Sequence, residues 1–201
     1  MPLHSAPGLE TIVPDVIDTL LGTLPGSPLD AIRAGRAVAR THSQESFRAL
    51  FTPDAPGDVS REERLALGAY VAALHGADDM VAHYAAGLAS AETVAAAAAQ
   101  TRATGPSGRF PPGPLSAEDT PAPAFALDAA TAAALGPRLA TAFAHAHMLV
   151  FHPRDAAPAD FAPLQAAGWS TDGLVTLSQI VAFLAYQIRA VHGLRVLATR
   201  L

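Results

Sequence analysis

The sequence predicts an all-α protein, and three observations support this. Apolar residues recur three or four positions apart along most of the chain, the spacing that gathers them on one face of a helix. Serine or aspartate precedes several of these segments, as helix caps do. Hydrophobic residues make up 50% of the 201 residues and charged residues 15%, a composition that supports a buried core. The alternating pattern of strands is essentially missing.

We expect three parts along the chain. Residues 1–13 are polar and contain prolines, and they predict an N-terminal arm. Residues 14–201 then form a single all-α domain. Within it, residues 105–123 hold six prolines and three glycines with almost no apolar periodicity, which indicates a long loop.

Three helices are expected in the first quarter of the domain. The first follows Pro14 and is indicated by apolar residues at helical spacing: Val16, Ile17, Leu20, Leu21 and Leu24. Pro25 and Pro28 end it. A second helix is predicted over 29–40 and a shorter third over 44–50, before a turn-rich connector at 53–59.

The segment from Ser60 to Gly76 gives the clearest helix signal. Ser60 and Glu63 have the spacing of a capping box, in which each side chain satisfies a free backbone amide of the other residue. Apolar residues at helical spacing follow: Leu65, Leu67, Tyr70, Val71 and Leu74. Gly76 is a natural C-terminal stop.

Two shorter helices are expected after Gly76. Asp78 or Asp79 can cap the first, which carries the apolar residues Met80, Val81, Tyr84 and Leu88. Ser90 can cap the second, which is expected to end near Arg102.

Three helices are predicted beyond the loop. Asp128 caps an alanine-rich helix that reaches Phe151. A short helix spans about 160–167, and Ser170 caps the longest helix, which extends to about Ala198.

Composition excludes several classes of function. The net charge is −5 and every one of the 13 basic residues is an arginine, so no broad basic field attracts nucleic acid. Cysteine is absent, which excludes disulfides, thiol nucleophiles and cysteine metal sites. No uninterrupted apolar run is long enough for a membrane span, and no signal peptide is apparent. We therefore expect a cytoplasmic protein with no membrane or nucleic-acid partner.

Two segments resemble a known family. SREERLALGAYVAALHGADDMVAHYAAGL, residues 60–88, is similar to the core helical hairpin of the alkylhydroperoxidase D / carboxymuconolactone decarboxylase superfamily. GWSTDGLVTLSQIVAFLAYQIRAVHGLRVL, residues 168–197, resembles the C-terminal helix of its peroxidase-related branch. The resemblance implies an all-helical fold with a core hairpin and a long C-terminal helix, and a chain that oligomerises. For active members it also implies a thiol peroxidase with a Cys-x-x-Cys pair at the start of the second hairpin helix.

The redox residues of that family are replaced here. On the family pattern, Ala77 and Met80 occupy the two cysteine positions, and Asp79 replaces a histidine between them. Tyr84 stands where a further histidine follows, and Leu65 where a glutamate precedes. A thiolate must form, oxidise and be resolved by a second thiol in that cycle, and neither alanine nor methionine can do this. We therefore expect no thiol peroxidase activity.

Asp79 and His83 form the strongest remaining catalytic candidate. Four residues separate them, so they share one helix face, and Asp79 could orient His83 as a general base. The alternative is a capping aspartate followed by a surface or interface histidine, which is the more common outcome. His75 lies four residues before Asp79, but Gly76 separates them, and we expect no metal site and no cofactor.

Three other residues have mainly structural interpretations, and a fourth, Arg189, could equally act at the site. His145 and His147 point in different directions on one helix, so packing or a partner contact is favoured over chelation. Trp169 is expected to anchor the start of the long helix. Arg189 could border the pocket, pair across a subunit contact or lie on the helix surface.

The leading hypothesis is a structural or regulatory subunit of this superfamily without redox chemistry. It would act as a homo-oligomer or beside a cysteine-bearing paralogue, because the long C-terminal helix has a wide apolar face. One alternative is a cofactor-free decarboxylase or lactone-acting enzyme that uses His83 and Asp79. Another is a small-molecule binding module with a pocket between the hairpin and the long helix. Leu65, Ala77, Met80, Tyr84 and Arg189 are the residues expected at that pocket or at an interface.

Overall fold

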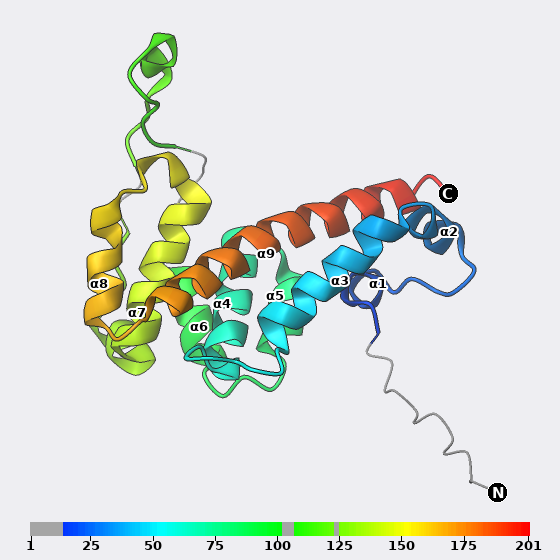
Figure 1. Ribbon diagram of the computed structural model, residues 1–201, viewed down its shortest axis with the longest axis horizontal. Coiled ribbons are helices and arrows are strands. Elements are labelled where there is room, and N and C mark those ends of the chain that lie inside the picture. Colours follow the sequence, from blue (N-terminus) through cyan, green and yellow to red (C-terminus); the bar gives the residue numbers. More distant parts are fainter. Residues whose placement is uncertain (1–13, 102–106, 123–124) are drawn as a thin grey trace, which may run out of the picture.

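The computed structural model describes residues 14–101, 107–122 and 125–201, and these residues form nine α-helices (Figure 1). The predicted arm at 1–13 lies outside them. The helices are α1 (Val16–Leu21), α2 (Pro28–Ala34), α3 (Ala37–Phe51), α4 (Arg61–Leu74), α5 (Asp78–Ala85), α6 (Ala91–Ala99), α7 (Ala129–Phe151), α8 (Phe161–Ala166) and α9 (Thr171–Ala198). No strand occurs in these ranges, so the predicted all-α class is confirmed.

The long helix α9 organises the fold. It runs across the molecule, with α1 and α3 along its C-terminal half and α7 and α8 near its start (Figure 1). The central helix α4 contacts α5, α6, α7 and α9. Tyr70 of α4 stacks on Phe143 of α7, with 4.0 Å between ring centroids. Elements before and after the loop therefore share one hydrophobic core.

The predicted cap of α4 is confirmed. The Ser60 amide donates to Glu63 Oε2 at 2.8 Å, and the Glu63 amide donates to Ser60 Oγ at 3.2 Å. The buried face of α4 includes Gly68, where an added Cβ would lie 2.7 Å from the Tyr84 ring. The missing side chain is what lets α5 approach α4 this closely.

The helices after the loop also begin where the sequence predicts. Asp128 accepts the Thr131 amide at 2.7 Å, and Ser170 accepts the Gly173 amide at 3.0 Å. One feature of α7 differs from the expected continuous helix. Gly136 has φ 75° and Pro137 follows it, so the chain leaves helical geometry there and α7 is kinked.

Helix boundaries in the N-terminal quarter differ from the prediction. The first helix ends at Leu21, because Gly22 adopts a left-handed conformation, and does not reach Leu24. The helices predicted over 29–40 and 44–50 are instead α2 and a longer α3. The break falls at Gly35 and Arg36, several residues before the expected gap. Arg40 therefore lies in the first turn of α3, where it pairs with Asp18 and Asp30.

Two predicted caps do not form. The N-cap of α5 is Ala77, and neither Asp78 nor Asp79 caps it. Ser90 is the N-cap residue of α6, yet its hydroxyl donates to Glu62 Oε1 at 3.2 Å and makes no capping bond. Helix α6 also ends at Ala99, short of the predicted end near Arg102.

The Pro/Gly-rich loop is described over residues 107–122. It projects away from the helices (Figure 1) and is closed by an isolated bridge between Gly108 and Thr120. Its base is held to α7, because the Ser107 amide donates to the Phe151 carbonyl at 2.8 Å.

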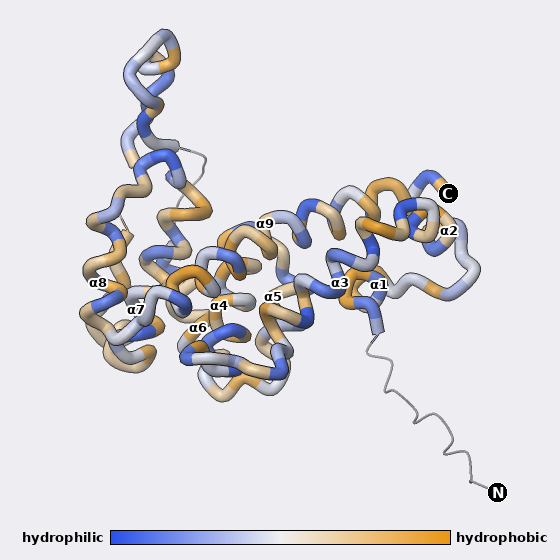
Figure 2. The backbone as a smooth tube through the Cα atoms, in the orientation of Figure 1, coloured by the Kyte–Doolittle hydropathy of each residue, from blue (hydrophilic) through white to orange (hydrophobic). Residues whose placement is uncertain are grey.

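Helix α9 is a core helix for much of its length. Apolar and polar turns alternate along it in Figure 2, and its inward residues Leu177, Ile180 and Leu184 are fully buried. By length and composition α9 could cross a membrane, but half of its most apolar segment is buried within the protein. The apolar face that suggests an oligomer is thus largely covered by the chain's own helices.

Candidate functional site

The proposed acid/base pair is not assembled. Asp79 is exposed and forms an ion pair with Arg195 near the end of α9. The hydrogen bond that Arg195 donates to Asp79 holds the pKa of Asp79 below its ordinary value. His83 lies between the rings of Phe47 and Tyr84, and burial lowers its pKa. No hydrogen bond joins Asp79 to His83 in the described part of the chain.

Two of the positions that carry redox chemistry in the resembled family are buried by packing. Met80 and Tyr84 are each 1% exposed. The Tyr84 hydroxyl donates to Gln187 Oε1 of α9 at 2.5 Å, and burial raises the tyrosine pKa. Leu65 is half-buried against the same core. Tyr84 is thus enclosed by the packing of α4, α5 and α9.

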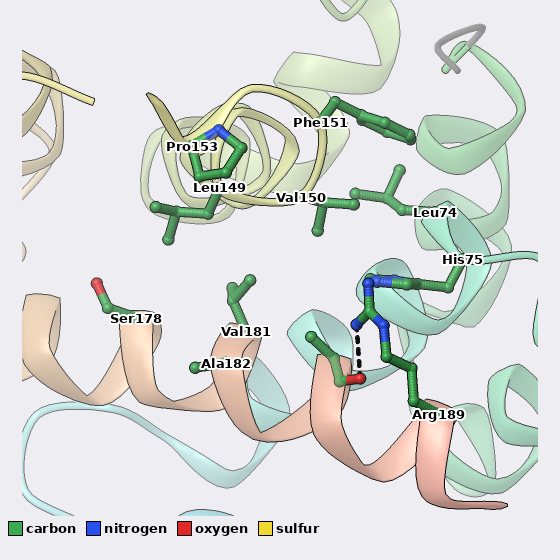
Figure 3. Close-up of a pocket in the computed structure, with 11 residues that line it drawn as sticks. Leu74, His75, Leu149, Val150, Phe151, Pro153, Ser178, Val181, Ala182 and Arg189 are labelled. Atoms are coloured by element: carbon green, nitrogen blue, oxygen red, sulfur yellow. Dashed lines mark hydrogen bonds between the residues drawn. The ribbon is translucent and has the colours of Figure 1, made fainter. Parts of the chain in front are cut away.

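A cavity of about 490 Å³ lies between the end of α4, the end of α7 and the middle of α9 (Figure 3). We call it the α7–α9 cavity. Most of its lining is apolar and belongs to α4, α7 and α9. The main apolar residues are Leu74, Leu149, Val150, Phe151, Val181 and Ala182. Its volume and lining are typical of small-molecule sites.

Polar groups gather at one end of the α7–α9 cavity. Figure 3 shows the Arg189 guanidinium beside the His75 ring. His75 Nδ1 lies 2.9 Å from the Val71 carbonyl, which can only accept, so Nδ1 carries the proton and Nε2 is left for another contact. Arg189 Nη1 donates to the Ala185 carbonyl at 2.7 Å. Ser178 lies toward the other end, on the same helix.

A second cavity, of about 390 Å³, adjoins the first at the start of α5. His75 and Arg189 line both cavities. Of the residues predicted for the site, this α5 cavity brings together Ala77, Asp79, Met80 and Arg189. His83, Tyr84 and Leu65 line neither cavity.

A third cavity, of about 540 Å³, continues the first along α9 toward α8. Ser178 and Ala182 belong to both, so one apolar groove follows the outer side of α9. Phe161 of α8 and Val175 of α9 extend it, together with the uncharged polar residues Gln165, Thr171 and Gln179.

The other candidate residues have structural roles. His145 and His147 are buried on α7, where His145 lies near Phe161 and His147 stacks on Phe125 at 4.2 Å. Trp169 is buried and donates from Nε1 to the Arg138 carbonyl at 3.1 Å, as expected of an anchor. Among the residues that the structure describes, no cluster of three or more metal-ligating side chains occurs.

The sequence did not indicate His75 and Arg195 as site residues. The spacing of His75 suggests at most a metal ligand, because its place at the junction of two cavities depends on how α4 ends against α9. Arg195 is 116 positions from Asp79, so no local pattern connects them.

The comparisons with known proteins give no family or relative. No protein-family model matches the chain, and no curated protein is similar to it. The resemblance to the alkylhydroperoxidase D / carboxymuconolactone decarboxylase superfamily therefore stays a hypothesis based on residues 60–88 and 168–197.

Proposed function

We propose that this protein binds a small, mainly apolar molecule in the α7–α9 cavity without redox chemistry. The observation that carries the proposal is the cavity itself. It holds about 490 Å³, has apolar walls from three helices and has polar groups at one end. Binding sites for small molecules usually combine such walls with a few polar groups that orient the ligand.

The geometry favours binding over catalysis by the predicted pair. Asp79 is engaged by Arg195, and His83 packs among aromatic rings away from the three cavities. An enzyme that used these two residues would need them at one reacting centre. This supports the binding module over the decarboxylase or lactone-acting enzyme.

A binding module is compatible with the predicted regulatory subunit. The α4–α5 hairpin packed on the long α9 supports placing the chain on the scaffold of the resembled superfamily, here without its redox residues. We also propose that the chain forms a homo-oligomer or assembles with a cysteine-bearing paralogue. This part of the proposal is based on the family resemblance alone. Ligand binding would then replace the peroxidase cycle as the function of the scaffold.

A titration with 1-octanol tests the proposal. Backbone amide chemical shifts are followed by NMR as 1-octanol is added to the full chain. The wild type should show saturable shifts at Val150, Val181 and neighbouring residues. A weak affinity, with Kd near the millimolar range, is expected for so small a ligand, since this corresponds to about −4 kcal/mol.

Blocking the cavity provides the matched comparison. Ala182→Phe places a ring in the α7–α9 cavity and should abolish the saturable shifts. Ala95→Phe makes the same change at an exposed position on α6, outside the cavity, and should bind as the wild type does. Equal binding by both variants, or no saturation in the wild type, would overturn the proposal.

A further inference from the structure

We infer that the ligand of the α7–α9 cavity is an apolar monocarboxylate, with its carboxylate on the Arg189 guanidinium beside His75. This inference rests on the proposed function and specifies the class of ligand. It combines three features of the cavity: an arginine with free donors, a wall without acidic groups and a long apolar groove leading away from that arginine.

Arg189 has donors to spare. A guanidinium carries five N–H groups, and one hydrogen bond, to the Ala185 carbonyl, is formed within the described residues. Across the same ranges Arg189 makes no ion pair. Arg195, further along α9, differs because it binds both Asp79 and the Leu20 carbonyl. Arg189 is thus the charged group available to a ligand.

The charge in the cavity favours an anion. Eleven described residues line the α7–α9 cavity. Arg189 brings a positive charge to this lining, and none of the eleven is acidic. Asp79 lines the adjoining α5 cavity, but its charge is compensated by Arg195. A carboxylate at Arg189 would form charge-assisted hydrogen bonds, which an alcohol at the same place cannot match. His75 lies beside the guanidinium and forms part of the wall around the head group.

The groove fits one charged end and an apolar body. Leu149, Val150 and Val181 line the cavity beyond Arg189. From Arg189 to Ser178 the helix rises about 16 Å, which exceeds the length of an extended octyl chain. The groove continues past Ser178 along Val175 with no second basic residue in its lining. The lining of this part of the groove holds no charged residue, so the second charge of a dicarboxylate would have no ion-pair partner there and a monocarboxylate is favoured.

A paired titration tests the inference. Octanoate and 1-octanol share a chain length and differ in the head group, and both are titrated into the full chain at pH 7.5 while amide shifts are recorded. In the wild type, octanoate should bind about tenfold more tightly than 1-octanol, a difference of about 1.4 kcal/mol. Arg189→Met keeps an unbranched apolar side chain but removes the charge, so it should abolish this preference.

Two further variants separate charge from shape. Arg189→Lys retains the charge and should keep part of the octanoate preference. Arg48→Met removes an exposed arginine of α3 that lies outside the cavity lining, and should leave the preference intact. Circular dichroism melting curves confirm that each variant is folded.

The outcomes distinguish the two proposals. If 1-octanol binds in the cavity and octanoate binds no more tightly, the carboxylate inference is wrong and the proposed function stands. A preference for octanoate that persists in Arg189→Met also overturns the inference. Failure of both probes to bind overturns the proposed function together with it.

Discussion

Asp79 at the start of α5 forms its ion pair with Arg195 near the end of α9, and within the described residues it makes no hydrogen bond to His83. The two residues are 116 positions apart in the chain. The pair joins the core hairpin to the long helix, and about two-fifths of each side chain remains exposed. A sequence pattern that resembles a catalytic dyad is thus used for a surface contact between helices.

Asp79→Asn should have a small effect on stability and none on His83. Exposed ion pairs contribute about 0.2–1 kcal/mol, so the free energy of unfolding should fall by no more than that amount. The pKa of His83, followed by NMR, should stay below its ordinary value and unchanged, because burial is what lowers it. Asp78→Asn, at the neighbouring exposed position, is the control. A fall of one unit in the His83 pKa, or about 1.4 kcal/mol of coupling, would show that the two residues interact.

Gly68→Ala should destabilise the contact between α4 and α5. The added Cβ would lie 2.7 Å from Tyr84 Cδ1 and 3.1 Å from Phe51 Cε1, and both rings are buried. Overpacking of this kind costs roughly 1–3 kcal/mol. Urea unfolding measures the loss.

Gly193→Ala is the matched control for that substitution. Gly193 lies within α9 with no atom within 4 Å of an added Cβ, so this alanine should stabilise the helix by about 0.5–1 kcal/mol. Equal effects of the two substitutions would contradict the close approach of α4 and α5 at Gly68.

Stability should decrease as the pH falls from 6.5 toward 4. Burial, with a smaller contribution from His152, lowers the pKa of His147 to about 4 from its ordinary value of 6.5. Between these pH values the unfolded chain binds a proton at His147 that the folded chain does not. The free energy of unfolding therefore decreases as the pH falls. Burial lowers the pKa of His83 and His145 in the same direction.

His147→Leu isolates the contribution of that histidine. His147 Nδ1 has no hydrogen-bond partner in the described residues, so leucine removes the titrating group without breaking a bond there. Urea unfolding measures the free energy of unfolding at pH 7 and at pH 5. The loss between these two pH values should be about 1–2 kcal/mol smaller for the variant than for the wild type. Identical pH dependence in the two proteins would contradict a neutral, buried His147.

Local signals predicted some helix ends and missed others. Ser60, Asp128 and Ser170 act as caps because each serves an amide three residues further along the chain, which a sequence shows directly. The sequence predicts the α2–α3 break too late in the chain, because Asp18 and Asp30 of other segments hold Arg40 in α3. Such tertiary contacts override local preference.

The candidate site was only partly predictable for the same reason. The family resemblance directed attention to the start of α5, and Ala77, Asp79, Met80 and Arg189 do line one cavity. The larger α7–α9 cavity depends on how α7 ends against α9, and its walls at Leu149 and Val181 carry no motif. Chemistry at a helix start can be recognised in a sequence, whereas an apolar cavity between distant helices cannot.

The most direct test of ligand binding in the α7–α9 cavity is a crystal structure of the full chain grown with octanoate. The account predicts electron density for the octyl chain against Val150 and Val181, with the carboxylate within hydrogen-bond distance of the Arg189 guanidinium. Octanoate bound elsewhere on the molecule, or a cavity filled by its own side chains at saturating octanoate, would contradict it.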